Sequence, residues 1–377
     1  MSPENRVVIW RSALLSGSET FVRNHGDHLT RWEPAYLGAT RVDSPLARET
    51  DIIAYPGESD RLAFLRLRLT GESPRLRRLL AVARPTLVHA HFAGDGWLIS
   101  DAARHQRVPL VVTAHGHDVT RQPDRGGLKG VRYRRNLGSV FDRAALIIAV
   151  SEVIRDRAIA RGAPASRVRV HYTGVPVPAS APAVSPSWDV CFVGRFVDKK
   201  GVDDLVAALG VLGPARPRAL FIGDGPLRPA AQAQARSLGI DATFAGSLPP
   251  AEVSSKLAAS RLLAAPSRTA ADGDTEGLPT TVLEAGALGI PVVSTFHSGI
   301  PEAVIDGTTG LLGAEREVTA LSRNIYRLLS DEPLRARLGR AARAHVAGNF
   351  NLAVQSRRLE ALYDEVAANH VLAGRFR

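Results

Sequence analysis

Two glutamates that bracket one predicted helix are the residues of this chain best placed to do chemistry. In "TEGLPTTVLEAGALGIPVVST" (275–295), Pro279 enters an almost wholly apolar stretch that Gly289 closes. Glu284 lies inside this stretch and Glu276 stands just ahead of it. Such a helix is normally buried between layers, and a buried carboxylate requires a partner or a neutralised state. We therefore expect both carboxylates to meet a ligand.

The start of the same helix predicts an anion site. We place Pro279 as the first helical residue, a position that proline favours. The N–H groups of Thr280, Thr281 and Val282 then lack acceptors within the helix and can bind an anion. Carboxylates so close to an anion would not bind phosphate, but they accept hydrogen bonds from uncharged hydroxyl groups. Because sugars and riboses offer such hydroxyls in pairs, the arrangement fits a nucleotide-linked sugar.

A second candidate anion site follows another strand-like run. In "FVGRFVDKKGVDDLVAAL" (192–209), Arg195 leaves the strand at once, and Lys200 and Gly201 open a helix. The two cations and the helix dipole can converge on one diphosphate; the alternative is a surface loop with two solvated cations. The "GDGP" in "LFIGDGPLRPAAQAQA" (220–235) allows close backbone approach, but it is not the dinucleotide fingerprint.

A third polar loop, "TAHGHDVT" (113–120), carries His115, His117 and Asp118. These residue types can bind a metal ion. They lie on one loop, however, and no second ligand cluster with paired spacing accompanies them. We therefore interpret the segment as a polar site loop and expect no metal.

The elements that must position these residues alternate regularly. Short β-branched runs alternate with amphipathic stretches rich in Ala, Leu and Arg, which is typical of parallel sheets with helices on both faces. The uncharged run "PVPASAPAVSPS" (176–187) has the composition of a linker. We expect two Rossmann-like, doubly wound α/β domains (1–175 and 188–350) that face across a cleft, with a C-terminal helix (351–377) returning to the first domain. Ligands should bind at the carboxyl ends of the strands. The strand-like runs are 7–10, 86–92, 110–115, 146–150, 168–172, 189–195, 219–225, 242–246, 262–267 and 291–295.

Length and composition indicate a folded two-domain protein. The chain has 377 residues, of which 45% are hydrophobic, and 377 exceeds what one core usually organises. A single cysteine, Cys191, excludes an intrachain disulfide and fits a reducing compartment. The sequence has no 18-residue apolar run and no signal-peptide core. We expect a soluble, cytoplasmic protein.

The positive charge of the chain is concentrated in its N-terminal half. The formal net charge is +11; residues 1–187 carry 27 Arg and Lys against 17 Asp and Glu, whereas residues 188–377 carry 21 against 20. The surplus gathers in 61–80 and 121–135. Three interpretations of this surplus charge are open: a solvated basic face, a surface that binds an anionic membrane, or a surface that binds a nucleic acid. Few aromatic residues interleave with these arginines, which argues against single-stranded nucleic acid.

Several motifs together resemble one known family. The segments "GRFVDKKG", "GDGP", "EGLPTTVLE" and "GIPVVST…SGIPE…DGTTGLL" occur in the order and spacing of the retaining glycosyltransferase family 4, which has the GT-B fold. The glutamate pair resembles that family's E-x7-E signature. "SETFV", "VHAHF", "TAHGHD" and "HSGIPE" resemble the subgroup of colanic-acid-type exopolysaccharide glycosyltransferases. The resemblance covers essentially the whole chain and is strongest over residues 189–312.

The resemblance implies a role for each donor-site residue. Arg195 and Lys200 would neutralise the donor diphosphate, and the amides after Leu278 would cradle it. Glu284 would bind the ribose hydroxyls, and Glu276 would contact the transferred sugar. The residues that the resemblance assigns to catalysis are Arg195, Lys200, Glu276 and His115. The residues that it places on the donor are Gly17, Arg195, Lys200, Gly246, Ser247, Glu276, Leu278, Thr280, Thr281 and Glu284.

Other residues are placed less directly by the resemblance. His115 would line the sugar pocket, and Gly17 would bring the first loop near the diphosphate, although many members have two adjacent glycines where this chain has "LLSGSETF". Backbone near Gly246 and Ser247 would meet the base. Glu19 would contact either donor or acceptor. The residues of the acceptor side would be Glu19, His117 and Asp118.

The implied activity is a hexosyltransferase-type transfer that retains anomeric configuration, needs no metal and uses no cofactor besides its co-substrate, a nucleotide-diphosphate sugar. The implied acceptor is a carbohydrate or lipid-linked hydroxyl in cell-surface polysaccharide biosynthesis, with peripheral contact to an anionic membrane and none to nucleic acid. A soluble natural-product acceptor is the first alternative. A nucleotide-sugar epimerase, a sugar phosphorylase and a basic nucleic-acid- or membrane-binding protein are the others.

Overall fold

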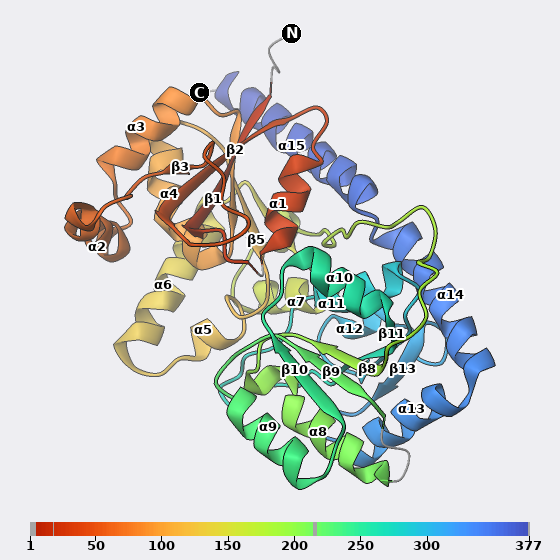
Figure 1. The fold of residues 1–377 in the computed structure, drawn as a ribbon. Coiled ribbons are helices and arrows are strands. Elements are labelled where there is room, and N and C mark those ends of the chain that lie inside the picture. The colour runs from red at the N-terminus through yellow and green to blue at the C-terminus, as the bar shows by residue number, and fades with distance from the viewer. Residues whose placement is uncertain (1–4, 18, 214–216, 376–377) are drawn as a thin grey trace. The chain divides into compact units, whose positions relative to one another are not determined.

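The computed structural model describes residues 5–17, 19–213 and 217–375 (Figure 1). The chain divides into two compact units. Unit 1 contains residues 1–174 and 352–377, and unit 2 contains residues 175–351. Each unit is built on one parallel sheet whose strands alternate with helices along the chain. The predicted α/β class with two Rossmann-like domains is therefore confirmed.

Unit 1 has a seven-stranded sheet with the order β3-β2-β1-β4-β5-β6-β7. Its core is formed by the apolar strands and by α15, whose Tyr363 is fully buried. The strands are β1 (Arg6–Leu14), β2 (Glu33–Arg41), β3 (Ile52–Ile53), β4 (Leu87–His91), β5 (Leu110–Ala114), β6 (Leu146–Ala149) and β7 (Val168–Val170). The helices are α1 (Thr20–Asp27), α2 (Arg61–Thr70), α3 (Pro74–Ala83), α4 (Ala93–His105), α5 (Arg121–Asp124), α6 (Gly127–Arg143), α7 (Glu152–Ala160) and α15 (Leu352–Arg375), with short 3-10 turns at Glu58–Asp60 and Ala165–Arg167.

Unit 2 has a six-stranded sheet with the order β10-β9-β8-β11-β12-β13. Its core includes Phe192, Phe196 and Phe221, which pack in a cluster of aromatic rings. The strands are β8 (Trp188–Val193), β9 (Ala219–Ile222), β10 (Ala242–Gly246), β11 (Ser260–Ala265), β12 (Val292–Thr295) and β13 (Gly310–Gly313). The helices are α8 (Val202–Val211), α9 (Arg228–Ser237), α10 (Pro250–Ala258), α11 (Thr280–Ala287), α12 (Ile300–Ala303), α13 (Val318–Ser330) and α14 (Glu332–Asn349), with a 3-10 turn at Asp198–Lys200.

The strand order reverses once in each sheet, between β1 and β4 in unit 1 and between β8 and β11 in unit 2. At such a point the loops that follow the two strands diverge to opposite faces and leave a crevice for a ligand. In unit 2, β8 leads to Arg195 and Lys200, and β11 leads to Glu276. The topology therefore brings two predicted donor motifs, far apart in the sequence, to one edge of the sheet.

In the part of the chain that the structure describes, three strands lie outside the predicted runs: β2, β3 and β13. β2 contains Pro34 and Gly38, and β3 has only two residues, so neither shows a continuous apolar pattern. Gly38 belongs in β2 because a Cβ there would lie 2.5 Å from Cβ of Leu14 on β1. Strand pairing with β1, rather than local propensity, decides this element.

The last helix, α15, packs against unit 1 beside α1 (Figure 1). The fully buried carboxylate of Glu360 accepts hydrogen bonds from the backbone N–H groups of Thr30 (2.5 Å) and Arg31 (2.6 Å). Residues 176–187 form no helix or strand and belong to unit 2. Within the described part of the chain, none of the helices combines the length and hydropathy needed to cross a membrane.

Candidate functional site

The loop after β8 is held in place by the "GDGP" turn after β9. Phe196 donates its N–H to Asp224 O (2.9 Å) and accepts the N–H of Leu227 (3.1 Å). A Cβ on Gly223 would lie 2.0 Å from Gly194 O, and its φ of +127° also favours glycine. The glycine of this turn therefore permits the close approach that fixes the backbone next to Arg195.

Arg268 ties the loop after β8 to the loop after β11. Its buried guanidinium contacts Asp198 (2.6 Å), Asp203 (2.9 Å) and Asp204 (2.6 Å). Burial alone lowers the pKa of Arg268, but the hydrogen bonds to three carboxylates outweigh it and raise that pKa. Asp198 in turn accepts the N–H of Ala271 (2.8 Å). The two loops therefore form one rigid support, and sequence reasoning missed Arg268 because its partners lie far away in the chain.

Lys200 and Glu276 form an ion pair at this support, with Nζ 2.9 Å from Oε1. The alternative of a surface loop with two solvated cations is wrong for Lys200: its side chain is only 16% exposed, because the Arg268 network holds the loop in place. The neighbouring Lys199 is also buried and binds Asp274 (3.2 Å) and the carbonyl of Thr275 (3.1 Å). Two lysines thus converge on the segment that carries Glu276.

The charge of Glu276 is set by these lysines. Burial would raise the pKa of Glu276, but Lys200 and then Lys199 outweigh it and lower the pKa to about 2. The carboxylate is therefore ionised at neutral pH. Its Oε1 has no aligned hydrogen-bond donor despite the nearby ammonium group. A hydroxyl group of a ligand could supply that missing hydrogen bond.

His297 and Glu315 fix the backbone of Glu276. The N–H of Glu276 donates to Nε2 of His297 (3.1 Å), so this nitrogen carries no proton. Nδ1 of His297 then donates to Glu315 (2.6 Å), which selects the tautomer. Ser298 Oγ donates to Glu276 O (2.6 Å). The sequence offered only the "HSGIPE" motif as a signal for these residues, and no role for His297 was predicted from it.

Helix α11 begins one residue later than predicted, because Pro279 is its N-cap with extended ψ of 116°. The N–H of Val282 donates to Pro279 O (3.2 Å), so the expectation that it is free for an anion is wrong. Among the described residues, the N–H groups of Thr280 and Thr281 have no recorded acceptor. The amide groups still available to an anion at the start of α11 are therefore those of Thr280 and Thr281, which follow the buried Leu278.

Glu284 lies about one turn inside α11 and is partly exposed. Burial raises the pKa of its carboxyl group, and no cation among the described residues opposes this effect. Glu276 and Glu284 therefore have pKa values moved in opposite directions by their surroundings. A carboxyl group without a cation partner is suited to accept hydrogen bonds from the hydroxyl groups of a ligand, because hydroxyl groups are neutral and the site then needs no cation.

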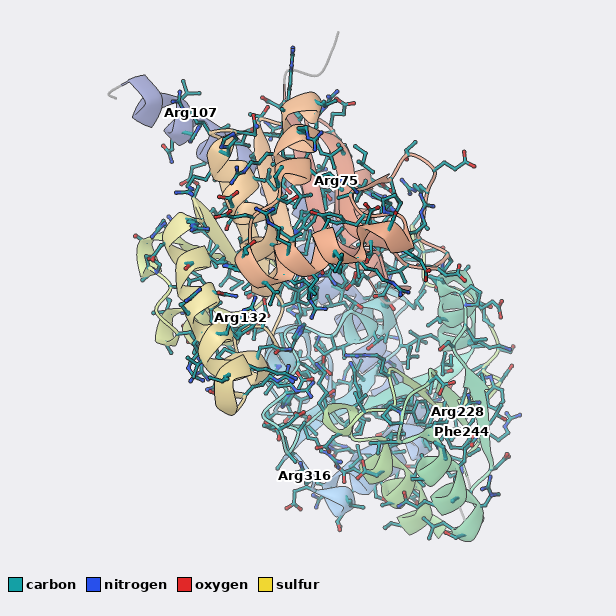
Figure 2. The ribbon with its side chains drawn as sticks, turned by 90° about the vertical axis from the view of Figure 1, so that its left-hand side faces the viewer. Arg75, Arg107, Arg132, Arg228, Phe244 and Arg316 are labelled. Atoms are coloured by element: carbon teal, nitrogen blue, oxygen red, sulfur yellow. The ribbon has the colours of Figure 1, made fainter. Side chains whose placement is uncertain are left out.

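The end of β10 supplies Gly246 and Ser247. Gly246 has a φ of +76° and accepts the N–H of Gly223 (2.7 Å), which places it beside the turn after β9. Arg228 donates to Phe244 O (3.2 Å) just before it (Figure 2). Ser247 is exposed. The predicted base-contacting backbone thus follows β10, the strand two places from β8 in the sheet.

In unit 1, the first loop is organised by Arg11. This side chain forms ion pairs with Glu19 and with Asp95 at the start of α4. Glu19 is buried and also accepts the N–H of Ser16 (3.3 Å). Gly17 is exposed, its φ is not positive and a Cβ would meet only Pro45 at 3.8 Å, so the fold itself does not require glycine there. We interpret Glu19 as holding this loop.

The loop after β5 carries the other predicted residues of unit 1. Asp118 is buried and accepts the N–H groups of His115 (3.0 Å), Gly116 (2.9 Å) and Ala93 (3.0 Å). All of its recorded bonds therefore go to backbone, and it orders the loop that presents His115. His117 is partly exposed and lies against the Phe92 ring.

His115, which is partly exposed, ends a row of three histidines, and sequence reasoning assigned no role to the other two, the buried His91 and His89. Its Nε2 lies 3.0 Å from Nδ1 of His91. His89, behind His91, contacts the hydroxyl of Tyr363 (2.6 Å) and that of Thr113 (2.7 Å). Burial lowers the pKa of His89 to about 3 and the pKa of His115 well below 6.5. These imidazoles are therefore neutral at pH 7, so His115 can offer a hydrogen bond but not a positive charge.

Within the described ranges, no group of three His, Cys, Asp or Glu side chains could hold a metal ion. Unit 2 instead gathers cations, free N–H groups and two unlike carboxylates at one sheet edge. This set can bind an anion next to hydroxyl groups. Of the predicted residues, Lys200 and Glu276 are in direct contact in unit 2, Asp118 accepts the N–H of His115 in unit 1, and Glu19 pairs with Arg11.

Two family models match the chain almost end to end. The model described as "Glycosyltransferase Family 4" matches residues 15–177, and "Glycosyl transferases group 1" matches residues 179–345. The chain belongs to the group 1 (family 4) glycosyltransferases. The resemblance predicted from its motifs is thereby confirmed, and the chain is an enzyme of the glycosyltransferase class.

Named relatives agree with this assignment. The chain is 29% identical over 296 residues to the amylovoran biosynthesis glycosyltransferase AmsK of Erwinia amylovora, covering 74% of this chain and 70% of AmsK. It is 34% identical over 242 residues to the putative colanic acid biosynthesis glycosyltransferase WcaL of Escherichia coli K12, covering 61% of this chain and 59% of WcaL.

The fold is shared with a solved structure. Anabaena Alr3699/HepE, in complex with UDP and glucose, superposes with a TM-score of 0.77 at 21% identity, covering 96% of this chain and all of that one. At this identity the likeness concerns the fold, which is the GT-B arrangement of two Rossmann-like domains that the motifs predicted.

Proposed function

We propose that this glycosyltransferase moves a sugar from a nucleotide-diphosphate sugar to an acceptor hydroxyl, with retained anomeric configuration and without a metal ion. The observation that carries the proposal is the ion pair between Lys200 and Glu276 beside the start of α11. A donor would bring a diphosphate and a sugar to this point at once. The diphosphate would then bind Lys200, and the sugar hydroxyls would bind Glu276.

The donor phosphates gain their charge balance from the protein. Arg195 is exposed next to Lys200 on the same loop, and no carboxylate partner is recorded for it among the described residues. The free N–H groups of Thr280 and Thr281 add the partial positive charge of a helix start. These groups stabilise the negative charge that develops on the diphosphate as the bond to the sugar breaks. A metal ion would have the same task, which is why we propose that none is needed.

The two glutamates divide the donor between them. Glu284 has a raised pKa and no cation partner, which suits hydroxyl groups of the ribose. Glu276 is ionised and held rigidly through His297, which suits the transferred sugar, where positive charge builds up in the transition state. His115 in unit 1 is neutral, and its Nε2 contacts His91. We propose that its other ring nitrogen contacts the same sugar.

Transfer with retention requires the acceptor to enter on the face that the diphosphate leaves. The anomeric carbon–oxygen bond breaks, and the electron pair goes to the diphosphate. The acceptor oxygen then bonds to the anomeric carbon, and its proton passes to a phosphate oxygen. The residues of unit 2 serve this step by holding the diphosphate close to the reacting carbon.

For the biological acceptor, we propose a saccharide of a cell-surface polysaccharide assembled on a lipid carrier at the inner face of the membrane. The two named relatives are, by their names, glycosyltransferases of amylovoran biosynthesis and of colanic acid biosynthesis. The net charge of +10 in residues 1–187 suits an anionic partner on the side of unit 1.

Calorimetric titration with nucleoside diphosphates, alone and as their sugar conjugates, tests the donor assignment. We expect one nucleoside diphosphate to bind, and its sugar conjugate to be consumed when an acceptor mixture is added. NMR of the product would show the anomeric configuration of the donor. Activity should persist in a chelator. Conversion of the donor into another sugar nucleotide without acceptor would instead support an epimerase, and loss of activity in chelator would refute metal independence.

A further inference from the structure

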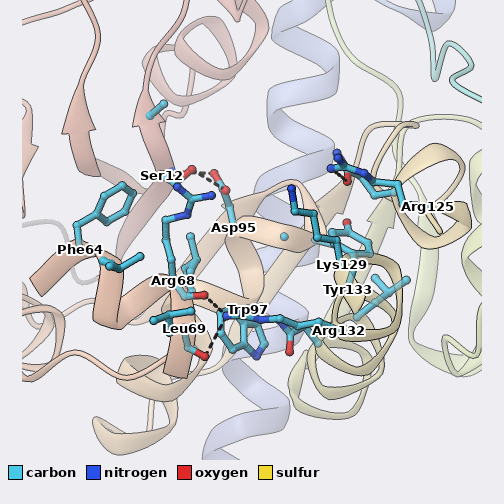
Figure 3. Close-up of a pocket in the computed structure, with 18 of the residues that line it drawn as sticks. Ser12, Phe64, Arg68, Leu69, Asp95, Trp97, Arg125, Lys129, Arg132 and Tyr133 are labelled. Carbon is cyan, nitrogen blue, oxygen red and sulfur yellow. Dashed lines mark hydrogen bonds between the residues drawn. The ribbon is translucent and has the colours of Figure 1, made fainter. Parts of the chain in front are cut away.

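A pocket in unit 1 is lined by none of the residues that are assigned above to the donor. It has a volume of about 690 Å³ and opens where the strand order of the first sheet reverses, after β1 and β4 (Figure 3). Its walls are the end of β1, the start of α4, and helices α2 and α6. Pockets at such a position are where α/β sheets bind ligands, and this volume fits a ligand of drug size.

One wall of the pocket is apolar. It comes from side chains on α2, α4 and α6, with the indole ring of Trp97 among them (Figure 3). This wall would bind hydrocarbon and would offer little to a bare sugar or a bare phosphate. The apolar lining residues are Phe64, Leu65, Leu69, Trp97, Leu98 and Leu137.

Cationic side chains lie among these apolar ones: Arg68 is on α2 with Leu65 and Leu69, and the Arg132 guanidinium lies 5.8 Å from the centre of the Trp97 ring (Figure 3). Arg68, Arg125, Lys129 and Arg132 line the pocket, and within the described residues none of the four has a recorded carboxylate partner. Arg132 donates to the carbonyl of Leu69 (3.0 Å), which links α6 to the end of α2. Four like charges that no protein carboxylate neutralises are complementary to an anion.

The single carboxylate in the pocket lining does not balance these cations. Asp95 accepts hydrogen bonds from Ser12, through N (2.7 Å) and Oγ (2.8 Å), and forms an ion pair with Arg11. Its charge is thus already matched. The pocket is left with an apolar wall, a surplus of positive charge and polar groups at its inner end.

The helices beside the pocket also expose apolar side chains to solvent. On α2, Leu62 (80% exposed), Leu65 and Leu69 follow each other at three- and four-residue spacing, so they share one helix face. On α6, Leu128 (88% exposed) and Val131 are likewise exposed. Large apolar side chains gathered on an exposed surface with cations between them mark an interaction site, and a membrane surface fits this composition.

We propose that this pocket binds the phosphate end of an anionic lipid, with the phosphate on Arg125 and Lys129 and the first carbons of the chain against Trp97. The volume suits a head group and a short part of the chain, so the rest would continue along the leucines of α2 into the bilayer. The inference deepens the proposed function, since it assigns to unit 1 the lipid phosphate that carries the acceptor.

Decyl phosphate, used below its micellar concentration on the full-length protein, tests the inference. We expect saturable binding in calorimetry, together with a change of tryptophan fluorescence that Trp97→Phe removes. Decanol and inorganic phosphate, each lacking half of the ligand, should bind at least about tenfold more weakly. Equal binding of inorganic phosphate would overturn the proposal in favour of a simple anion site, and equal binding of decanol would overturn it in favour of an apolar site.

The variant Arg125→Gln/Lys129→Gln should weaken decyl phosphate binding at least about tenfold, as expected for two charge-assisted contacts. Arg66→Gln/Arg78→Gln is the matched control, because it removes two exposed arginines of the same unit that do not line the pocket. The control should bind normally, and equal weakening in both variants would show a general charge effect and refute the site.

Binding of the nucleoside diphosphate, measured on the same samples, keeps this test apart from the proposed function. It should be unchanged in Arg125→Gln/Lys129→Gln, which also shows that the variant is folded. If the wild-type protein does not bind a nucleoside diphosphate, the donor assignment is refuted. Binding of decyl phosphate would still support the lipid pocket in that case. If Arg125→Gln/Lys129→Gln does not fold, Lys129→Gln alone is measured, and normal decyl phosphate binding by it would count against the pocket.

Discussion

Replacing Lys200 by alanine should cost unit 2 stability as well as activity. The lysines hold the pKa of Glu276 at about 2 instead of its ordinary 4.5, although burial acts in the opposite direction. A shift of this size corresponds to about 3 kcal/mol of stability at neutral pH. Lys200 is the largest of the lowering causes. We therefore expect Lys200→Ala to lose about 2–3 kcal/mol, or roughly 5–10 °C in the melting of a unit of this size.

The pH dependence follows from the direction of the shift. Because the folded-state pKa of Glu276 is depressed, its contribution is complete above the unfolded value of 4.5 and is lost as pH falls toward 2. The deficit of Lys200→Ala should therefore be large at pH 7 and shrink steadily below pH 4.5. In Lys200→Ala only the smaller effects of Lys199 and His297 oppose the burial of Glu276, so its pKa is higher than in the wild type and protonation relieves part of the cost.

Differential scanning calorimetry at pH 7 and pH 4 measures this effect. The transition to follow is the one whose melting temperature rises when a nucleoside diphosphate binds. Arg195→Ala is the matched control, since Arg195 lies on the same loop and is exposed, so it should melt as the wild type does. The double variant Lys200→Ala/Glu276→Gln should recover most of the stability. An undiminished melting temperature for Lys200→Ala at pH 7, or no recovery in the double variant, would refute the reasoning.

Three further predictions concern the neighbours of this pair. Glu284→Gln should weaken binding of the free nucleoside diphosphate and of the donor alike, mostly in KM, whereas Glu276→Gln should lower kcat and leave nucleotide affinity nearly intact; calorimetry and kinetics that show the reverse would mean that the pair is assigned backwards. His297→Ala should lower kcat roughly tenfold or more by releasing the backbone of Glu276, with donor KM much less affected, and an equal loss in KM would contradict a positioning role. Gly223→Ala should destabilise unit 2 by about 2 kcal/mol or more because its Cβ would lie 2.0 Å from a carbonyl oxygen, while Gly348→Ala, with open space at its Cβ, should not; equal melting temperatures would exclude this packing role.

Local patterns determined much of the fold before any contact was known. Continuous apolar runs bounded by turn residues are enough to find buried parallel strands, because such strands are covered on both faces. Ten such runs were predicted, and each lies on a strand of the structure. β2 was not found, because Pro34 and Gly38 interrupt its pattern and only its pairing with β1 makes it a strand.

The sequence by itself also determined which residues could form the donor site. Glu276, Glu284, Arg195 and Lys200 stand out because a charged side chain directly after a buried strand, or inside an apolar helix, has no purely structural reason to be there. Spacing along one segment was sufficient for this, since each motif is local. The sequence also identified the family, because several such motifs occur in a fixed order along the chain.

Only the tertiary structure decided how these residues are charged and supported. The pairing of Lys200 with Glu276 joins loops from two different strands, and Arg268 and His297 act through partners that no local pattern connects to them. A pKa depends on burial and on charges brought close by folding, so the pKa of Glu276 is lowered and that of Glu284 is raised. The same holds for the pocket beside Trp97, whose walls come from segments that meet only when the sheet of unit 1 is formed.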